Sequence, residues 1–349
     1  MYTREIQAPR DTPVENGLPV QGTWDRAFKE VNLPDIHRPY RFPLPGWAKD
    51  YRLKEWQRFI VQDDQYIFEA LLANLKLYCL ANVRVYNKET GDLYECRKLL
   101  LGKGWRLPRS LSNAAAGSRS QKFFFLVHNW LDVDFIKLEI DIEARRGRPA
   151  LTVDLGYAME RRDVTPMAVS LCFTDNRSMY AFKALTAVRG DIVLGTKRIN
   201  MEPARTSGIF CDCKGFFPYP MRNITVGAMG FTGDGRRFGF HIAENQAKET
   251  NRNNENALWV DGRLNPLPPV RITMSTGVDA DWIIQDLEGM VDLVFTPKAH
   301  NNGSIRVLLT SAEYNAPLGI FNGMVANSEG EQIQVHNVWG MGEKLYLRV

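Results

Sequence analysis

The sequence of 349 residues predicts an all-β protein made of two antiparallel β-barrels with a proline-rich N-terminal arm. From Tyr51 onward, short segments with alternating apolar and polar residues follow one another, which is typical of strands with one buried face. Turns that contain Gly, Asn or Asp separate many of these segments, as in β-hairpins. The chain is longer than one small core requires, so two units are expected.

Residues 1–48 are predicted to form an extended arm that lies over the body of the protein. Prolines recur along this segment and interrupt any regular element. Within it, Trp24–Val31 is compatible with a short helix. Four aromatic side chains indicate that the arm packs against the body; they are Trp24, Tyr40, Phe42 and Trp47.

The clearest strand is Ile136–Glu143, in which isoleucine or leucine alternates strictly with charged residues. Asp64–Lys76 is compatible with a helix or with two strands and a tight turn. The other strands predicted in the first half are Trp56–Val61, Leu75–Tyr86, Leu93–Leu101, Lys122–Trp130, Leu151–Leu155, Met167–Phe173 and Met179–Leu185. Those predicted in the second half are Thr206–Cys213, Thr225–Phe231, Arg237–Ala243, Ala257–Val260, Val270–Met274, Trp282–Asp286, Met290–Thr296, Ile305–Leu309, Leu318–Ala326 and Gln332–Trp339.

About eight strands fall in each half of the chain, which is the number that closes a barrel around one small ligand. The change from one barrel to the other is expected near residues 190–203. This gives an arm over residues 1–48, a first barrel over 49–195 and a second over 196–349. Asp261–Gly262 is expected to be a hairpin turn, because both residue types tolerate positive φ.

The composition excludes several classes of protein. The net charge of +4 is small and spread along the chain, so neither nucleic acid nor an anionic membrane is an expected partner. Apolar runs such as Phe123–Val127 are far shorter than the roughly 20 residues of a membrane-spanning helix. The first residues contain no apolar signal segment, so a cytoplasmic location is expected. Glycine-rich phosphate loops are also absent, and no cofactor is predicted.

The five cysteines do not predict a disulfide framework, because their number is odd and the chain is large. Cys211 and Cys213 are two residues apart and would lie on one face of a strand. No second pair of cysteines or histidines stands at ligand spacing. Two ordinary buried thiols are therefore expected there, and no metal site.

Two carboxylates are the candidate catalytic groups. Asp212 is followed closely by aromatic residues that include Phe217 and Tyr219, and apolar surroundings raise the pKa of a carboxyl group. Such a group can protonate an alkene or an enol. Glu255 and Asn256 precede a predicted strand and would orient a polar group at a barrel mouth. The alternatives are, for Asp212, a strand carboxylate that faces water or pairs with an arginine and, for Glu255 and Asn256, turn chemistry in which Asn256 accepts local backbone bonds.

Two histidines are candidate ligand contacts. His241 alternates with Phe240 and Ile242, so it points either to solvent or into a polar barrel interior. His128 is in phase with apolar neighbours in its strand and is expected in a core or a cavity. Inward-facing aromatic residues, Phe217 and Tyr219 among them, would supply an apolar ligand cavity.

A series of residues occurs in a recognisable order and spacing: Asn32–Asp35, Lys54–Gln57, Asp212, Gly215, Phe217–Tyr219, Arg237–Phe240, Glu255–Leu258, Asp261–Gly262, Trp282 and Gly289–Pro297. In this order the series resembles an uncharacterised prokaryotic family, domain of unknown function 2804, over most of the chain. That family is distantly similar to the carotenoid hydratase group. The resemblance implies paired lipocalin-like barrels and activities such as hydration or cyclisation of apolar substrates.

The favoured functional hypothesis is a cofactor-independent acid–base enzyme, of hydratase, isomerase or cyclase type, that acts on an apolar small molecule. Asp212 would be the general acid, Glu255 a second acid–base or orienting group, and Asn256 an orienting donor. One alternative is a non-catalytic carrier or sensor of a lipid-like ligand, which needs the same cavity but no acid of raised pKa. Another is a structural or partner-binding protein with filled barrels. The oligomeric state, and whether both carboxylates share one pocket, stay open at this stage.

Overall fold

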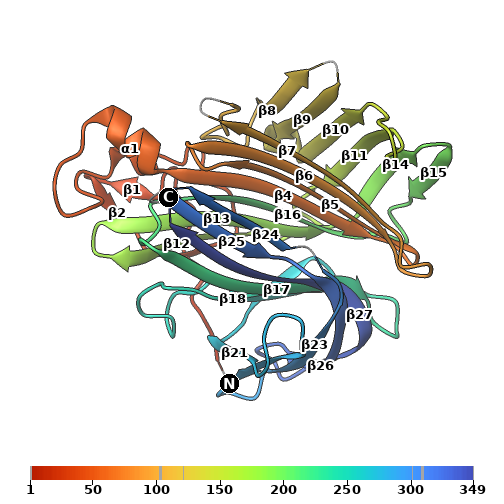
Figure 1. The fold of residues 1–349 in the computed structure, drawn as a ribbon. Helices are drawn as coiled ribbons and strands as arrows, with labels where there is room; N and C mark the ends of the chain where they lie inside the picture. The colour runs from red at the N-terminus through yellow and green to blue at the C-terminus, as the bar shows by residue number, and fades with distance from the viewer. Residues whose placement is uncertain (1, 102–103, 121, 301, 308–309, 349) are drawn as a thin grey trace.

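The computed structural model describes residues 2–101, 104–120, 122–300, 302–307 and 310–348. Strands occupy 58% of the chain and helices 4%, which confirms the predicted all-β class. Three large antiparallel sheets make up most of the molecule (Figure 1). Sheets of six and eight strands form the N-terminal half, and a curled sheet of eleven strands forms the C-terminal half.

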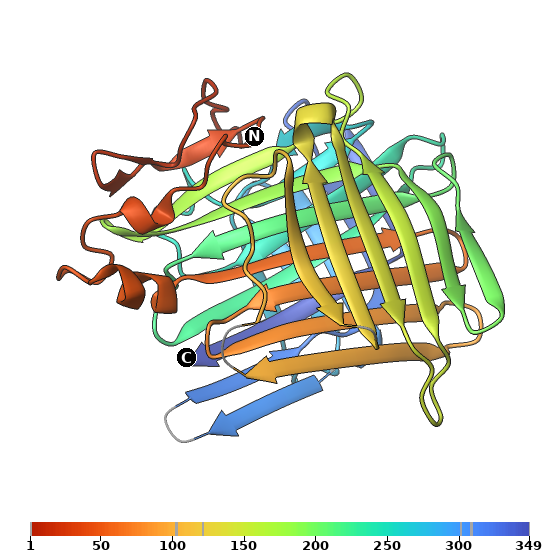
Figure 2. The ribbon, with the colours of Figure 1, turned by 90° about the horizontal axis from the view of Figure 1, so that it is seen from above.

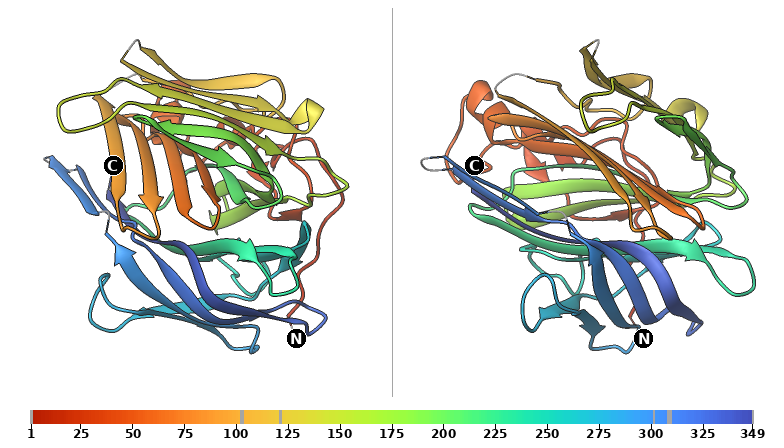
Figure 3. Two further views of the ribbon diagram at one scale, coloured as in Figure 1. Left: turned by 90° about the vertical axis from the view of Figure 1, so that its right-hand side faces the viewer. Right: turned by 45° about the vertical axis from the view of Figure 1, so that its right-hand side comes forward.

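The eight-stranded sheet is the middle layer of the molecule (Figure 3). Because other sheets cover both of its faces, strands such as β5 (Tyr66–Asn74) and β13 (Arg177–Thr186) are buried along almost their whole length. Asp64–Lys76 is thus mostly the strand β5. In spatial order the strands are β3 (Gly22–Trp24), β12 (Met167–Thr174), β13 (Arg177–Thr186), β16 (Ser207–Gly215), β4 (Lys54–Gln62), β5 (Tyr66–Asn74), β6 (Tyr78–Asn87) and β7 (Leu93–Leu101).

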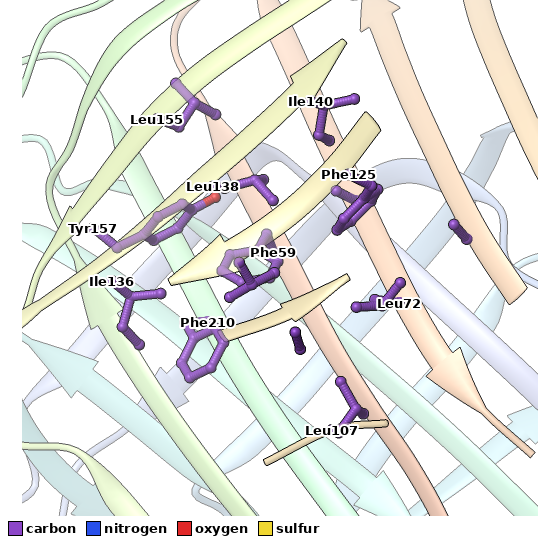
Figure 4. Packing of buried hydrophobic residues seen from close by; sticks show 14 of the residues in the cluster. Phe59, Leu72, Leu107, Phe125, Ile136, Leu138, Ile140, Leu155, Tyr157 and Phe210 are labelled. Carbon is purple, nitrogen blue, oxygen red and sulfur yellow. The ribbon is translucent and has the colours of Figure 1, made fainter. Parts of the chain in front are cut away.

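The six-stranded sheet covers one face of the middle layer (Figure 2). Ile136, Leu138 and Ile140 point inward with at most 1% exposure, as the alternation in this strand predicts. They lie among side chains of the eight-stranded sheet, such as Phe59 and Phe210, in the first core (Figure 4). The strands are β15 (Lys197–Met201), β14 (Val188–Leu194), β11 (Leu151–Ala158), β10 (Phe135–Ile142), β9 (Phe123–Trp130) and β8 (Ala114–Ser120), and the 3-10 turn η2 (Leu131–Val133) joins β9 to β10.

The eleven-stranded sheet curls around a second core. Its two ends approach each other, since the Ile272 amide of β21 donates to Glu244 of β18 at 2.8 Å. Phe240, Trp282 and Phe295 fill the interior. The path runs β20 (Arg263–Pro266), β19 (Ala257–Val260), β18 (Arg237–Glu244), β17 (Met221–Phe231), β27 (Gln332–Arg348), β26 (Leu318–Ala326), β23 (Val291–Ala299), β22 (Trp282–Asp286) and β21 (Val270–Met274), with β24 (Asn302–Val307) and β25 (Thr310–Asn315) to the side.

Strand pairing changes from one half to the other between β16 and β17. β16 pairs with β4 and β13, whereas β17 pairs with β18 and β27. The predicted boundary at residues 195/196 precedes this point by two strands. Of the predicted strand Ile305–Leu309, residues 308–309 lie outside the described part of the chain.

A third apolar cluster joins the two halves. It combines side chains from the outer face of β12, β13 and β16 with others from the eleven-stranded sheet, such as Met229 and Trp259. The middle sheet is therefore covered by the six-stranded sheet on one face and by the C-terminal half on the other. The three-layer arrangement is visible in both views of Figure 3.

The predicted N-terminal arm contains β1 (Val14–Glu15), β2 (Leu18–Pro19), β3, the 3-10 turn η1 (Leu33–Asp35) and, at its end, α1 (Gly46–Arg52). The short helix that the sequence allows at Trp24–Val31 does not form. Backbone amides there bond to distant segments instead, as Val31 does to the Arg109 carbonyl at 2.8 Å. Trp24 is buried as expected, but Phe42 and Trp47 are 58% and 77% exposed.

The first residues reach the other half of the molecule. The Arg4 guanidinium donates to the Asn254 side chain and, at 3.0 Å, to the Asn256 carbonyl. Asn254 in turn donates to the Tyr2 hydroxyl at 3.1 Å. These contacts connect the N-terminus to the eleven-stranded sheet (Figure 1). In the described part of the chain, no helix combines the length and apolar character needed to cross a membrane.

Candidate functional site

A cavity of about 70 Å³ lies between the eight-stranded and eleven-stranded sheets. Strands β4, β13 and β16 supply one wall, and β17, β18 and β27 supply the other. Ile209, Met229 and Phe217 contribute apolar surface, while Lys183 and Glu255 bring charge. The cavity therefore belongs to the contact between the two halves, whereas the sequence suggested a cavity inside one barrel.

Lys183 and Glu255 form a buried ion pair in this cavity. Lys183 projects from β13, and Glu255 lies two residues before β19, so the pair connects the two halves of the protein. Their side chains are only 2% and 5% exposed. Asn245 donates a further hydrogen bond to the Glu255 carboxylate at 2.8 Å. Water is thus replaced around this carboxylate by fixed donors.

His241 completes the polar group of the cavity. Its Nε2 atom lies 3.8 Å from a Glu255 carboxylate oxygen, which is beyond hydrogen-bond distance. Among the described residues this nitrogen is buried without a hydrogen-bond partner. The strand β18 therefore directs His241 toward the cavity and not toward solvent, which decides between the two orientations left open by the sequence.

The charge states of this polar group follow from burial and from Lys183. Burial alone would raise the pKa of Glu255, but the Lys183 ammonium and the neighbouring His241 outweigh it and hold this pKa well below its usual value. Burial, followed by the positive charge of Lys183, lowers the pKa of His241 to about 4. At neutral pH Glu255 is thus a carboxylate and His241 a neutral imidazole.

A second group of buried charges borders the cavity. Arg58 contacts Glu343 of β27 and lies 3.3 Å from Glu69. Glu69 also pairs with Arg84, so the two arginines and two glutamates compensate each other. Neither these residues nor Lys183 were predicted from the sequence as site residues. The available signal was a charged residue inside a nearly continuous apolar run, as in Tyr66–Asn74, which indicates a strand buried on both faces.

Asp212 lies on the opposite face of the middle sheet. Its neighbours Cys211 and Cys213 line the cavity, and because side chains alternate in β16, Asp212 points into the first half. There Lys214 donates to both of its carboxylate oxygens, at 2.6 and 2.7 Å, and Gln57 donates at 3.1 Å. The structure therefore separates Asp212 from Glu255. A catalytic role for Asp212 stays a prediction.

Asn256, Phe217 and Tyr219 were predicted as ligand contacts, and of these only Phe217 lines the cavity. The Phe217 ring stacks on Trp56, with ring centroids 5.2 Å apart. Asn256 is fully buried, but both ends of its amide bond to backbone groups at 2.8 Å. Tyr219 is 46% exposed, and its hydroxyl accepts a hydrogen bond from Arg348 at 3.0 Å. Asn256 thus anchors the chain before β19.

His128 lies in the six-stranded sheet, which does not contribute to the cavity. It projects from β9, and its Nε2 atom is 2.9 Å from the Glu139 carboxylate of β10. Both side chains are partly exposed, at 20% and 32%. His128 does not line the cavity between the halves. The structure therefore does not bring it together with His241.

Cys211 and Cys213 share one face of β16, as their spacing predicts, and both line the cavity. Burial raises the pKa of Cys211 to about 11 and that of Cys213 well above its usual value. Both thiols are therefore protonated at neutral pH and unreactive as nucleophiles. Within the described residues, no group of three or more His, Cys, Asp or Glu side chains is arranged to hold a metal ion.

The comparison with protein families places the chain. A family model described as a domain of unknown function, DUF2804, matches residues 3–348. The chain belongs to the DUF2804 family. The family predicted from the residue series is thereby confirmed, and in this DUF2804 protein several members of that series, such as Phe240, Trp282 and Phe295, are core residues of the eleven-stranded sheet.

No curated protein matches this DUF2804 chain. Two of the similar solved structures are kievitone hydratase from Nectria haematococca and a protein described as an AttH candidate from Nitrosomonas europaea. The match to kievitone hydratase has a TM-score of 0.46 at 11% identity, and it covers 84% of this chain and 88% of the hydratase chain. The second has a TM-score of 0.43 at 11% identity, with coverage of 86% and 94%.

Proposed function

We propose that this protein binds an apolar small molecule with one polar group in the cavity between its two halves, and acts as its carrier or sensor. The observation that supports this is the polar group of Lys183, Glu255 and His241 at the wall of a cavity that is otherwise mostly apolar. A ligand hydroxyl would bond to His241 Nε2, which is buried without a partner among the described residues. The apolar part of the ligand would lie against Ile209 and Phe217.

The charge state of Glu255 favours a carrier over a general-acid enzyme. A catalytic acid must hold its proton near neutral pH, which requires a raised pKa. The pKa of Glu255 is instead lowered by Lys183. Asp212, the other predicted acid, is directed away from this cavity.

The second candidate function is a cofactor-independent acid–base enzyme of hydratase, isomerase or cyclase type. It is favoured by the neutral imidazole of His241, whose Nε2 atom has no hydrogen-bond partner among the described residues and lies 3.8 Å from the Glu255 carboxylate, since a neutral imidazole with an unpartnered nitrogen can act as a general base. In this function His241 would take a proton from the substrate or from water. Glu255 would stabilise the imidazolium that forms.

Native mass spectrometry of the purified protein, followed by extraction of any bound molecule, tests the proposal. The carrier predicts a co-purifying apolar molecule that is recovered unchanged after incubation with the protein in D₂O. An acid–base enzyme would introduce deuterium at carbon or add water to the molecule. Cys211→Phe, which fills the cavity, should lower the bound fraction, whereas a protein that is empty in both forms would contradict both functions and favour a structural role.

A further inference from the structure

A second cavity, of about 170 Å³, lies on the other side of the Arg58–Glu343 ion pair. It is formed by the outer face of β5, β6 and β7 together with β25 and β27, which run beneath these strands in Figure 1. The first cavity shares only Trp56 and that ion pair with it. It is therefore a distinct site between the same two halves.

Leucines dominate the wall of this second cavity. Leu71 and Leu80 come from the middle sheet, and Leu345 and Leu347 come from β27. Leu99 of β7 lies at the opening, with 44% of its surface exposed. An apolar cavity of about 150 Å³ stays dry in water and binds a molecule the size of benzene, so this one accepts an apolar chain of comparable bulk. The opening at Leu99 allows a longer chain to extend outward.

The charges at the wall are already compensated. Arg58 pairs with Glu343, and Arg97 at the rim lies 3.0 Å from Glu95. Among the described residues of this wall, no excess positive charge is left to neutralise an anionic head group. Because an unpaired charge is costly to bury, a fatty acid or another ionised amphiphile fits this site poorly.

An uncharged acceptor in the wall has no hydrogen-bond partner among the described residues. Asn82 of β6 lines the cavity and is only 2% exposed, and its side-chain carbonyl oxygen is buried without a hydrogen bond among the described residues. Leaving such an acceptor unpaired is unfavourable, and a ligand donor at this point would remove that penalty. A hydroxyl group is an uncharged donor that suits this acceptor.

We infer that the second cavity is a binding site for an uncharged, chain-like apolar alcohol, whose hydroxyl donates to Asn82 and whose chain lies along the leucines toward Leu99. The probes are 1-octanol, octanoate and heptyl methyl ether, which has as many non-hydrogen atoms as octanol but no donor. Calorimetric titration of the full chain should show octanol binding about two- to tenfold more tightly than the ether, which is the range of one neutral hydrogen bond. Octanoate should bind more weakly than both.

Two variants locate the site. Asn82→Leu should abolish the preference for octanol over the ether. Leu99→Trp should block the opening and weaken octanol binding at least tenfold, while Leu93→Trp, on the same strand and 37% exposed but outside the cavity wall, should leave it unchanged. Equal binding of octanoate and octanol, or octanol binding that survives Leu99→Trp, would overturn the inference. If Asn82→Leu does not fold, the Leu99 and Leu93 pair decides, because both positions are partly exposed.

Discussion

Asp212 and Glu255 lie on opposite sides of the eight-stranded sheet, and each is paired with its own buried lysine. Lys214 holds Asp212 in the first half, and Lys183 of the same sheet holds Glu255 at the contact with the second half. One sheet thus presents a buried ion pair on each face. The pair on the cavity side connects the two halves, and the pair on the other side belongs to the interior of one.

Glu255→Gln should destabilise the protein strongly, because it leaves the Lys183 ammonium buried without a counter-charge. The expected loss in the free energy of unfolding is about 3–5 kcal/mol, measured by urea denaturation. Asp191→Asn is the control, since its pair with Arg198 is exposed and should contribute less than about 1 kcal/mol. Adding Lys183→Met to Glu255→Gln should restore most of the loss. If Glu255→Gln and Asp191→Asn lowered the free energy of unfolding by the same amount, the buried pair would contribute little to stability.

Asp212→Asn should lower stability by a comparable amount, about 3–5 kcal/mol, because Lys214 then stays buried and unpaired. Occupancy of the cavity between the halves should not change, since Asp212 faces away from it. Native mass spectrometry of the variant measures that occupancy, and urea denaturation measures the stability. A folded variant that retains its ligand but loses turnover of it would instead support the predicted role of Asp212 as a general acid.

The stability of the protein should fall between pH 6.5 and pH 4 because of His241. Its pKa is lowered from 6.5 to about 4 on folding, so the unfolded chain binds an additional proton in this range. Stability is therefore full above pH 6.5 and decreases by at most about 3 kcal/mol as the pH approaches 4. Urea midpoints at pH 7.5 and 4.5 measure the difference.

His241→Gln should reduce that pH dependence, while His336→Gln, at an exposed position of β27, should preserve it. The lowered pKa of Glu255 contributes in the same direction as the pH falls through its usual value of 4.5, where the unfolded carboxylate becomes protonated. A variant His241→Gln with an unchanged pH profile above pH 4.5 would exclude His241 as the source.

Gly262→Ala should be more harmful than Gly235→Ala, although both glycines have positive φ, +73° and +85°. At Gly235 an added methyl group meets no atom within 4 Å, so only backbone strain of roughly 1–2 kcal/mol is expected. At Gly262 it would lie 1.7 Å from the Asp163 carbonyl oxygen, which belongs to the N-terminal half. Displacing that contact should add roughly 1–3 kcal/mol. Thermal unfolding of both variants measures the difference, and equal losses would contradict a role of Gly262 between the halves.

The sequence predicts local features of this fold well because short-range patterns determine them. The alternation in Ile136–Glu143 identifies β10, and Asp261–Gly262 forms the expected hairpin turn with φ of +47° and +73°. The short helix with which Trp24–Val31 is compatible does not form, because distant backbone partners outweigh a weak local preference. Phe42 and Trp47 show similarly that aromatic character alone does not determine burial.

The candidate site is less predictable because it depends on which sheets face each other. Glu255 and His241 meet Lys183 only when β13 of the middle sheet packs on the eleven-stranded sheet. No local pattern encodes that contact. Alternation did place Asp212 away from Cys211 and Cys213, but only the layering shows that the cysteines face the cavity.

Strand β27 follows all the other described strands along the sequence, yet it lies in the middle of the eleven-stranded sheet, between β17 and β26. As the chain leaves the ribosome, β17 and β26 therefore have no neighbour on one side until these 17 residues emerge. Such unpaired edges associate readily with other chains. Nascent protein that stalls or is cut short before Gln332 should consequently be a substrate for chaperones and proteases. Such a chain already contains all the wall residues of the first cavity except those of β27.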